Sequence, residues 1–290
     1  MTGPVSALLD DGRLHLQHGP IDLIIGVEAP DDATCRIAYR AARDRFATVL
    51  DELVPELPLL RAPLGAAPQG QIARRMHRAC GTVAQGDFVT PMAAVAGSVA
   101  DTVLSAMLAA TPLIRAHVNN GGDIALHLAP GAEYRAAIAG LDGQLAGQIT
   151  LRATDGVGGI ATSGQGGRSL SLGIAGAVTV LARDAATADA AATLIANAVD
   201  LPGHPAITRQ PACDVWPDTD LGARPVVTHV APLPPADIAR ALSHGVTRAQ
   251  AMIDTGAIAA AALVLQGQGV TVGDFEDGAT ALKERSLSYA

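Results

Sequence analysis

The sequence predicts a protein of the α+β class, in which mixed sheets pack against helices. Strand-like and helix-like patterns follow one another along the chain without the regular alternation of a doubly wound parallel sheet. Hydrophobic residues make up 49% of the chain, yet only three Phe, three Tyr and one Trp are present. The core must therefore be built from Ala, Val, Leu and Ile, which suits helices packed closely on sheets. We expect a single domain over residues 1–290, with a connector at 55–70.

The first third of the chain supplies the clearest local patterns. Residues 13–17 alternate polar and apolar side chains, 21–27 form a second strand pattern, and the Gly19-Pro20 turn between them indicates a hairpin. Apolar residues at helical spacing predict a helix over about 34–53. Four prolines between 55 and 68 then indicate an extended connector, and a short basic helix is expected over 71–79.

A helix rich in small residues is predicted from about Met92 to Ala110. Its Ala and Gly residues allow close approach of neighbouring backbone, so we expect it to be buried. Asp101 interrupts this apolar run. A buried carboxylate needs partners, so Asp101 is interpreted either as a site residue or, more simply, as a solvent-facing position.

The second half mixes further strand and helix patterns. Residues 134–138 and 148–152 are candidates for paired strands, and 170–182 for an apolar strand followed by a helix over 187–199. A strand is expected at 225–230 and a helix at 235–249. The apolar run at 257–265 fits either a strand or a helix.

Composition excludes several classes of function. The net charge is −8, and no basic run exceeds the Arg74-Arg75 pair, so we expect no nucleic-acid partner. No convincing membrane span is found, and charged residues between 10 and 13 interrupt any signal-peptide core. Three widely spaced cysteines fit buried, reduced thiols in a cytoplasmic protein. The Ala/Gly-rich helices are compatible with a homodimer.

The stretch Val118–Ala125 is the first candidate for a site. It is interpreted as the end of a long apolar helical segment, where Asn120, Gly121 and Gly122 precede Asp123. Paired glycines leave room for a ligand to approach the main chain, and the aspartate can bind a ribose hydroxyl or a metal. An ordinary turn between two elements is the structural alternative.

Two later stretches add to this candidate. Residues 159–168 contain four glycines together with Thr162, Ser163 and Arg168. Main-chain N–H groups of such a loop can converge on an anion, and an arginine can pair with phosphate or carboxylate. A surface loop or a hairpin turn is the alternative interpretation.

Asp189 and Thr193 are four residues apart and therefore share one face of the helix predicted at 187–199. With Asp184 or Thr187 as the N-cap, both lie near the positive end of the helix dipole. A carboxylate and a hydroxyl placed in this way can hold Mg²⁺ through oxygen. Aspartate in a first helical turn is also ordinary helix chemistry.

Taken together and in this order, the three stretches resemble the ApbE-like superfamily, which includes the FAD:protein FMN transferases. The matching segments are Asn120-Gly121-Gly122-Asp123, Ala161-Thr162-Ser163-Gly164 and Ala188-Asp189 to Thr193. The resemblance implies a T-fold-like α+β structure, a cleft for FAD or FMN, and Mg²⁺ held by Asp189, Thr193 and the main-chain oxygen of Ala161. It further implies that Asp123 orients the ligand, with the residues of the two glycine-containing turns binding the cofactor.

One segment departs from the transferase pattern. These enzymes carry a His-Ile-Ile-Asp-Pro-type segment between the second and third stretches, whereas residues 169–176 contain neither histidine nor an acid. The chain is therefore most similar to the shorter cytoplasmic branch of the superfamily.

Three functions follow as hypotheses. The first is a Mg²⁺-dependent FMN transferase or hydrolase acting on a flavin nucleotide. The second is an enzyme for another small molecule, with Arg168, His117 or His127 handling a carboxylate. The third is a non-catalytic flavin-binding protein.

Overall fold

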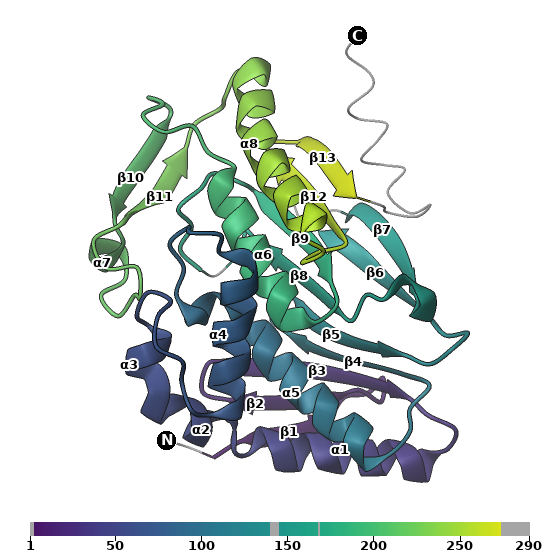
Figure 1. Cartoon of the computed structure of the whole chain (residues 1–290). Helices are drawn as coiled ribbons and strands as arrows, with labels where there is room; N and C mark the ends of the chain where they lie inside the picture. Colours follow the sequence, from purple (N-terminus) through teal and green to yellow (C-terminus); the bar gives the residue numbers. More distant parts are fainter. Residues whose placement is uncertain (1–2, 140–144, 168, 274–290) are drawn as a thin grey trace. The chain divides into compact units, whose positions relative to one another are not determined.

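The computed structural model describes residues 3–139, 145–167 and 169–273, and it divides the chain into two compact units. The ribbon in Figure 1 shows the elements of both units. Unit 1 comprises Met1–Tyr134, Leu151–Ala161 and Ala182–Ala190, and unit 2 comprises Arg135–Thr150, Thr162–Leu181 and Ala191–Ala290.

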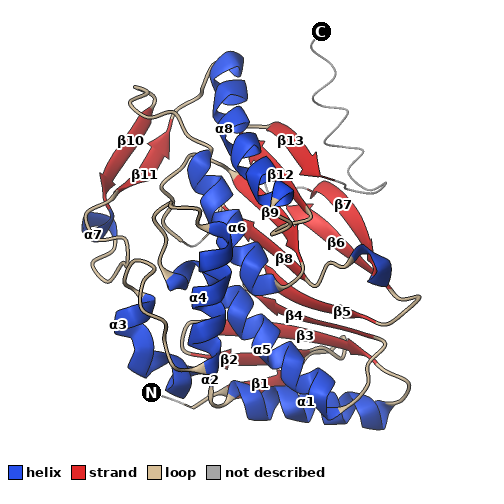
Figure 2. Ribbon diagram, in the orientation of Figure 1, coloured by secondary structure: helices blue, strands red, loops and turns tan. Residues whose placement is uncertain are grey.

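Unit 1 is built on an antiparallel sheet whose neighbouring strands run in the order β1-β2-β3-β4-β5-β8 (Figure 2). These strands are β1 (Val5–Leu8), β2 (Leu14–His18), β3 (Ile21–Glu28), β4 (Arg115–Asn120), β5 (Asp123–Leu128) and β8 (Gly159–Ser163). Alternate residues of β3 such as Leu23 and Ile25 are fully buried, as the period of a half-buried strand requires. The expected hairpin at 13–27 is confirmed as β2 and β3.

Helices cover this sheet. They are α1 (Asp32–Phe46), α2 (Val49–Leu53), α3 (Leu57–Leu60), α4 (Gln71–Val83) and α5 (Val95–Ala110), with 3₁₀ turns at Val54–Glu56, Pro91–Ala94 and Ala153–Asp155. Helix α5 packs on β4, β5 and α1 and is buried along much of its length, as its small residues predict. A Cβ added at Gly97 would overlap the main chain of Ala185, so only glycine fits at this crossing.

Residues 55–70 differ from the extended connector that the prolines suggested. The segment begins with two short helical turns, and the Glu56 carboxylate accepts hydrogen bonds from the main-chain N–H groups of Gln69 and Gly70. It lies within unit 1 and does not separate the two units. Proline is well tolerated in a first helical turn, which is why the same residues fit helices here.

The described strands of unit 2 form three groups. Strands β9 (Ala177–Ala182), β12 (Ala260–Leu265) and β13 (Gln268–Gly273) form antiparallel neighbours, and β12 is buried at every residue. The run at 257–265 is therefore strand. Two further pairs are β6 (Glu133–Ala139) with β7 (Leu145–Arg152), and β10 (Ile207–Pro211) with β11 (Pro225–Val230).

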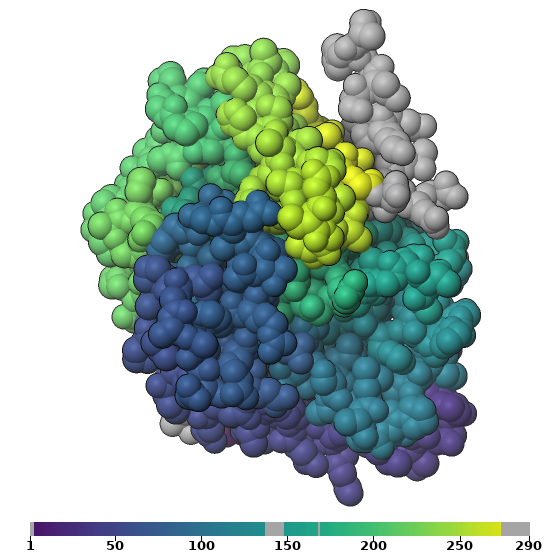
Figure 3. All heavy atoms as spheres, in the orientation of Figure 1, coloured from purple at the N-terminus to yellow at the C-terminus, as the bar shows by residue number. Residues whose placement is uncertain are grey.

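The remaining helices are α6 (Ala185–Ala198), α7 (Ala212–Val215) and α8 (Pro235–Asp254). Helix α6 begins in unit 1 and ends in unit 2. Helix α8 packs on β12 and β13, and its yellow-green residues lie on the surface drawn in Figure 3. The predicted α+β class, with antiparallel sheets packed against helices, is confirmed.

Two sequence-based interpretations are corrected. Residues 118–125 do not end a helix, because α5 stops at Ala110 and β4 intervenes before the glycines. Asp101 is not solvent-facing, since it is only 6% exposed.

By length and composition, one helix among the described residues, at Pro91–Ala110, is apolar enough to cross a membrane. More than half of its most apolar window is buried within the fold.

Candidate functional site

The Asn-Gly-Gly-Asp stretch forms a two-residue β-hairpin turn. Asn120 ends β4, Asp123 begins β5, and the two are paired across the hairpin. Gly121 and Gly122 both have positive φ, 67° and 117°, which is the conformation that tight hairpin turns need and glycine adopts readily. The Asn119 side chain accepts a hydrogen bond of 2.8 Å from the Gly122 N–H. A Cβ at Gly122 would meet nothing, so the main chain here is open to an approaching group.

Packing brings this turn beside the beginning of α5. The Asn120 side-chain amide donates to the Ala96 carbonyl at 3.1 Å. Next to it, the Gly97 N–H donates to the Asp189 carboxylate at 3.0 Å. The N–H groups of a first helical turn have no partner inside the helix, so Asp189 supplies one from outside. Thus Asn120 and Asp189, which the sequence predicted as site residues, both contact the first turn of α5.

Asp101 makes the reciprocal contact with α6. Its two carboxylate oxygens accept from the N–H groups of Ala185 at 3.1 Å and Ala186 at 2.9 Å. Of the two N-caps left open by the sequence, Asp184 is the one that accepts the Thr187 N–H, at 2.8 Å. Helices α5 and α6 therefore cap each other, each with an aspartate placed one turn or more inside its own helix.

Electrostatics set the Asp189 carboxyl apart from ordinary surface acids. Desolvation is the main cause that raises its pKa well above the usual range, and the Asp123 carboxylate raises it further. The main-chain N–H groups of Gly97 and Ala96 act in the opposite direction.

Burial likewise raises the pKa of Asp101 to about 6. The N–H of Ala186 and the guanidinium of Arg75, whose Nη1 lies 3.5 Å from the carboxylate, partly offset this effect. Asp101 therefore caps the first turn of α6, although removing its carboxylate from water is unfavourable.

The pair formed by Asp123 and Asp189 fits a hard cation in its donor chemistry. Both side chains offer carboxylate oxygens, and a cation would relieve the repulsion that raises the pKa of Asp189. No group of three or more His, Cys, Asp or Glu side chains arranged for a metal occurs among the described residues. Magnesium commonly uses one or two carboxylates and completes its shell with water and phosphate.

The other residues expected at a metal are placed as follows. Ala161 is buried in β8 of unit 1. Thr193 is half-buried in α6, one turn after Asp189, and belongs to unit 2.

Residues 159–167 are not an open glycine-rich loop, because the first five form strand β8. The N–H groups of residues 165, 166 and 167 donate to the carbonyls of Ala175, Gly176 and Gly164. They are therefore engaged within unit 2 and do not converge on a shared anion, as the glycine spacing had suggested.

The side chains of this stretch have local roles of their own. The Thr162 hydroxyl lies 2.9 Å from the hydroxyl of buried Thr179, and Ser163 is half-buried. Gly164 has φ of 140°, and a Cβ there would lie 2.6 Å from the Gly176 carbonyl oxygen. Arg168 lies outside the described residues.

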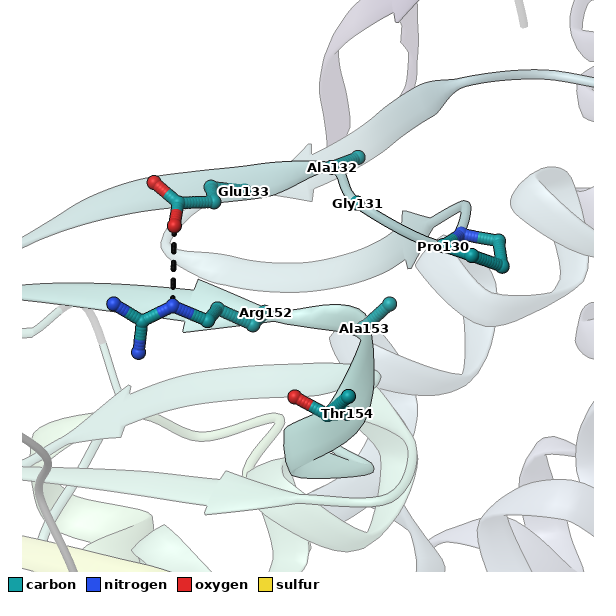
Figure 4. A pocket seen from close by; sticks show the side chains of 7 residues that line it. All are labelled: Pro130, Gly131, Ala132, Glu133, Arg152, Ala153 and Thr154. Atoms are coloured by element: carbon teal, nitrogen blue, oxygen red, sulfur yellow. Dashed lines mark hydrogen bonds and ion pairs between the residues drawn. The ribbon is translucent and has the colours of Figure 1, made fainter.

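One cavity, of about 360 Å³, lies at the start of β6 and the end of β7. Figure 4 shows its lining, Pro130–Glu133 and Arg152–Thr154, with the ion pair between Glu133 and Arg152 at 3.1 Å. None of the site residues predicted from the sequence is among them. The cavity and the carboxylate pair are thus separate features.

Sequence reasoning missed the main-chain groups of Ala96 and Gly97. The available signal is the helix of small residues with Gly97 near its start, a pattern that indicates burial but does not indicate a partner for the Gly97 N–H. Asp101 was noticed as a polar exception, but its partners lie 84 and 85 residues further along the chain. No local pattern identifies such partners.

Comparison with known proteins places the chain in a family. Residues 6–272 match the family model described as AbpE bacteria. A UPF0280 protein of Methanosarcina acetivorans is 31% identical over 191 residues, covering 62% of this chain and 70% of the relative. A UPF0280 protein of Methanopyrus kandleri is 37% identical over 164 residues, covering 55% of this chain and 61% of that relative.

Among solved structures, the apo form of the flavinyl transferase ApbE of Pseudomonas stutzeri is similar with a TM-score of 0.45 and 15% identity, covering 97% of this chain and 95% of that one. The family model spans nearly the whole described chain and includes all three motifs. The resemblance to the ApbE-like superfamily is confirmed. The chain therefore belongs to the AbpE bacteria family.

Proposed function

We propose that this protein is an ApbE-like enzyme that binds a flavin nucleotide or a related small molecule at the Asn120–Asp123 turn. The observation that carries the proposal is the buried Asp189 carboxyl, which accepts the Gly97 N–H at the first turn of α5 and whose pKa is raised well above its usual range by burial and by the Asp123 carboxylate. Perturbed carboxyls next to main-chain donors are typical of functional sites. Membership of the family supports the same interpretation.

Each of these residues of unit 1 has its own role in such a site. The Gly121-Gly122 turn presents uncovered main chain, against which a phosphate or a ring can lie. Asn120 fixes the turn to α5 through Ala96, and Gly97 fixes the Asp189 carboxylate in one orientation. Asp123, at the beginning of β5, orients the ligand by accepting a hydrogen bond from a hydroxyl or an amine of the ligand.

Asp189 and Asp123 are the residues of this unit that would hold Mg²⁺, with Ala161 and Thr193 as the further ligands implied by the family. When bound, the metal would neutralise phosphate charge during phosphoryl transfer. As the specific alternative reaction, we propose that the enzyme transfers FMN from FAD with the help of this metal. We also propose that it acts as a homodimer in the cytoplasm.

Equilibrium binding of FAD and FMN, with and without MgCl₂, tests the site, and release of AMP from FAD tests the reaction. Asp189→Asn is the informative variant, since its amide oxygen still accepts the Gly97 N–H while the charge is removed. We expect Mg²⁺-dependent flavin binding and AMP release to fall by at least about tenfold, the change that loss of about 1.4 kcal/mol produces.

Asp101→Asn is the matched control, because Asp101 caps the partner helix in the same way. Equal effects of the two variants on flavin binding would reduce Asp189 to a structural cap and refute the proposed site. Flavin binding without AMP release would favour the non-catalytic alternative. Absence of flavin binding would leave an enzyme for another small molecule.

A further inference from the structure

A second, smaller cavity of about 190 Å³ lies in unit 1 on the strands preceding the hairpin turn. Its lining includes Arg13, just before β2, with Arg115 and His117 of β4 and Gly26 of β3, and the carboxylates of Asp11 and Glu28 line it as well. His117 and Asn120 are three residues apart in β4, so their side chains leave opposite faces of the sheet. The cavity is thus distinct from the site around Asp123 and Asp189.

The imidazole of His117 is fixed between two neighbours. Gly26 is its partner on β3, and a Cβ added there would overlap the imidazole ring. The ring of Tyr134 lies 5.4 Å away, centroid to centroid, at 51°. The imidazole therefore lies directly over bare main chain, and its place depends on residue 26 being glycine.

His117 is a neutral donor and acceptor at pH 7. Burial, with smaller contributions from Arg13 and Arg115, lowers the pKa of its imidazole to about 4. A neutral imidazole carries one N–H donor and one acceptor nitrogen. In the part of the chain that the structure describes, neither ring nitrogen of His117 has a hydrogen-bond partner. A polar group of this kind, partly desolvated and facing a cavity, is suited to a ligand.

Two guanidinium groups flank the same cavity. Arg13 uses Nε and Nη2 to contact Asp11 at 2.7 Å. Arg115 uses Nη2 to contact Glu28 at 2.7 Å and Nη1 to donate to the Glu133 carbonyl at 2.8 Å.

These pairs leave donors for a further acceptor. Each guanidinium has five N–H groups. Among the described residues, the contacts with Asp11, Glu28 and Glu133 use neither Nη1 of Arg13 nor Nε of Arg115. Both carboxylate partners are about half exposed, 53% for Asp11 and 50% for Glu28, and ion pairs of this kind are worth only about 0–1 kcal/mol. An anionic ligand can therefore share or replace Asp11 and Glu28.

We propose that this cavity binds a small oxyanion, a carboxylate or a phosphate, between Arg13 and Arg115, with His117 as the third donor. Forked guanidinium groups match both kinds of oxyanion. The volume is below the roughly 300–1,000 Å³ of pockets for drug-sized ligands, so the site takes a small metabolite or one terminal group of a larger one. A whole dinucleotide does not fit.

The test follows the imidazole of His117 by NMR in protein labelled with ¹⁵N-histidine, at pH 7 and constant ionic strength. Sodium acetate and sodium phosphate are titrated in separate arms, with sodium chloride as the reference salt. We expect a saturable shift of the His117 resonances with a Kd in the millimolar range. Saturation by acetate alone identifies a carboxylate site, and saturation by phosphate alone a phosphate site.

Three variants separate a built site from general attraction to positive charge. Arg13→Gln should weaken binding at least about tenfold. Arg152→Gln is the matched control, because Arg152 is 48% exposed against 47% for Arg13 and also pairs with a carboxylate, but does not line the cavity. This variant should leave the Kd within about twofold of the wild-type value. Gly26→Ala should displace the imidazole from its place over residue 26, because the new Cβ overlaps the ring, and abolish binding without changing any charge.

Melting curves of each variant identify any loss of folding. No saturable shift with either anion, or equal weakening by Arg13→Gln and Arg152→Gln, would overturn the proposal. No flavin or Mg²⁺ is involved, so the outcome is independent of the proposed function.

Discussion

The reciprocal caps predict a specific dependence of stability on pH, and Asp101 is the residue that produces it. Its carboxyl is 6% exposed, and burial raises its pKa from 3.8 to about 6. Between these values the native state binds a proton that the unfolded state has released. The free energy of unfolding must therefore fall as pH rises through this window and level off above it.

The magnitude follows from the same two values. The pKa of Asp101 rises from 3.8 to about 6 on folding, and a change of one pKa unit corresponds to about 1.4 kcal/mol. The free energy of unfolding should therefore fall by about 3 kcal/mol between pH 4 and pH 7. Asp101→Asn removes this contribution because the amide does not titrate. The amide keeps one acceptor oxygen and leaves one of the N–H groups of Ala185 and Ala186 unsatisfied, at a cost of about 1–3 kcal/mol.

Urea unfolding of both proteins from pH 4 to pH 8 measures the effect. Other titrating groups are present in both proteins, so the difference between the two curves reports Asp101 together with its repulsion of Asp189. We expect the stability of the wild type relative to Asp101→Asn to fall by about 3 kcal/mol between pH 4 and pH 7. Parallel curves over this range would refute the idea that Asp101 is a desolvated, ionisable cap.

Three further predictions concern packing and reactivity. Ser98→Ala should raise the free energy of unfolding by about 1 kcal/mol, measured by urea titration, because the Ser98 hydroxyl is buried in α5 without a described hydrogen-bond partner. Gly97→Ala should lower it by about 3 kcal/mol or more, since the new Cβ meets the main chain of Ala185, which no side-chain rotation can move; an unchanged melting temperature would contradict the crossing. Mass spectrometry after brief alkylation should find Cys213 modified and Cys80 intact, because Cys213 is exposed whereas burial raises the pKa of the Cys80 thiol.

The exposure of Cys213 corrects one sequence-based expectation, that all three cysteines are buried. Apolar and polar neighbours of a cysteine in sequence do not report on its burial, because the covering side chains come from elsewhere in the fold. The expectation holds for Cys80, which lies on the apolar stripe of α4.

Much of the fold was predictable from local patterns. The β2–β3 hairpin follows from period-two alternation, helix α1 from apolar residues at helical spacing, and helix α5 from its run of small residues. Strand β4 was missed because the preceding apolar helix was read through to the glycines. The helical turns at 54–60 were missed because prolines were read as breakers, although two of them occupy first-turn positions.

The candidate site was predictable only in its components. The motif order identified Asn120, Asp123 and Asp189, and the family match confirms the relationship that the order implied. That Asp123 raises the pKa of Asp189 depends on how the β4–β5 hairpin and α6 pack around α5, and no sequence spacing encodes this.

The sequence by itself determined the α+β class, the family and the residue types available for chemistry, because periodicity, turn residues and motif order are properties of neighbours along the chain. The tertiary structure decided which carboxylates are desolvated and what they contact. Asp101 and Asp189 both lie inside predicted helices, and no local pattern shows that each caps a helix more than eighty residues away. The physical reason is that burial and hydrogen-bond partners are set by the crossing of α5 with α6 at Gly97, where only the absence of a side chain lets the two helices approach.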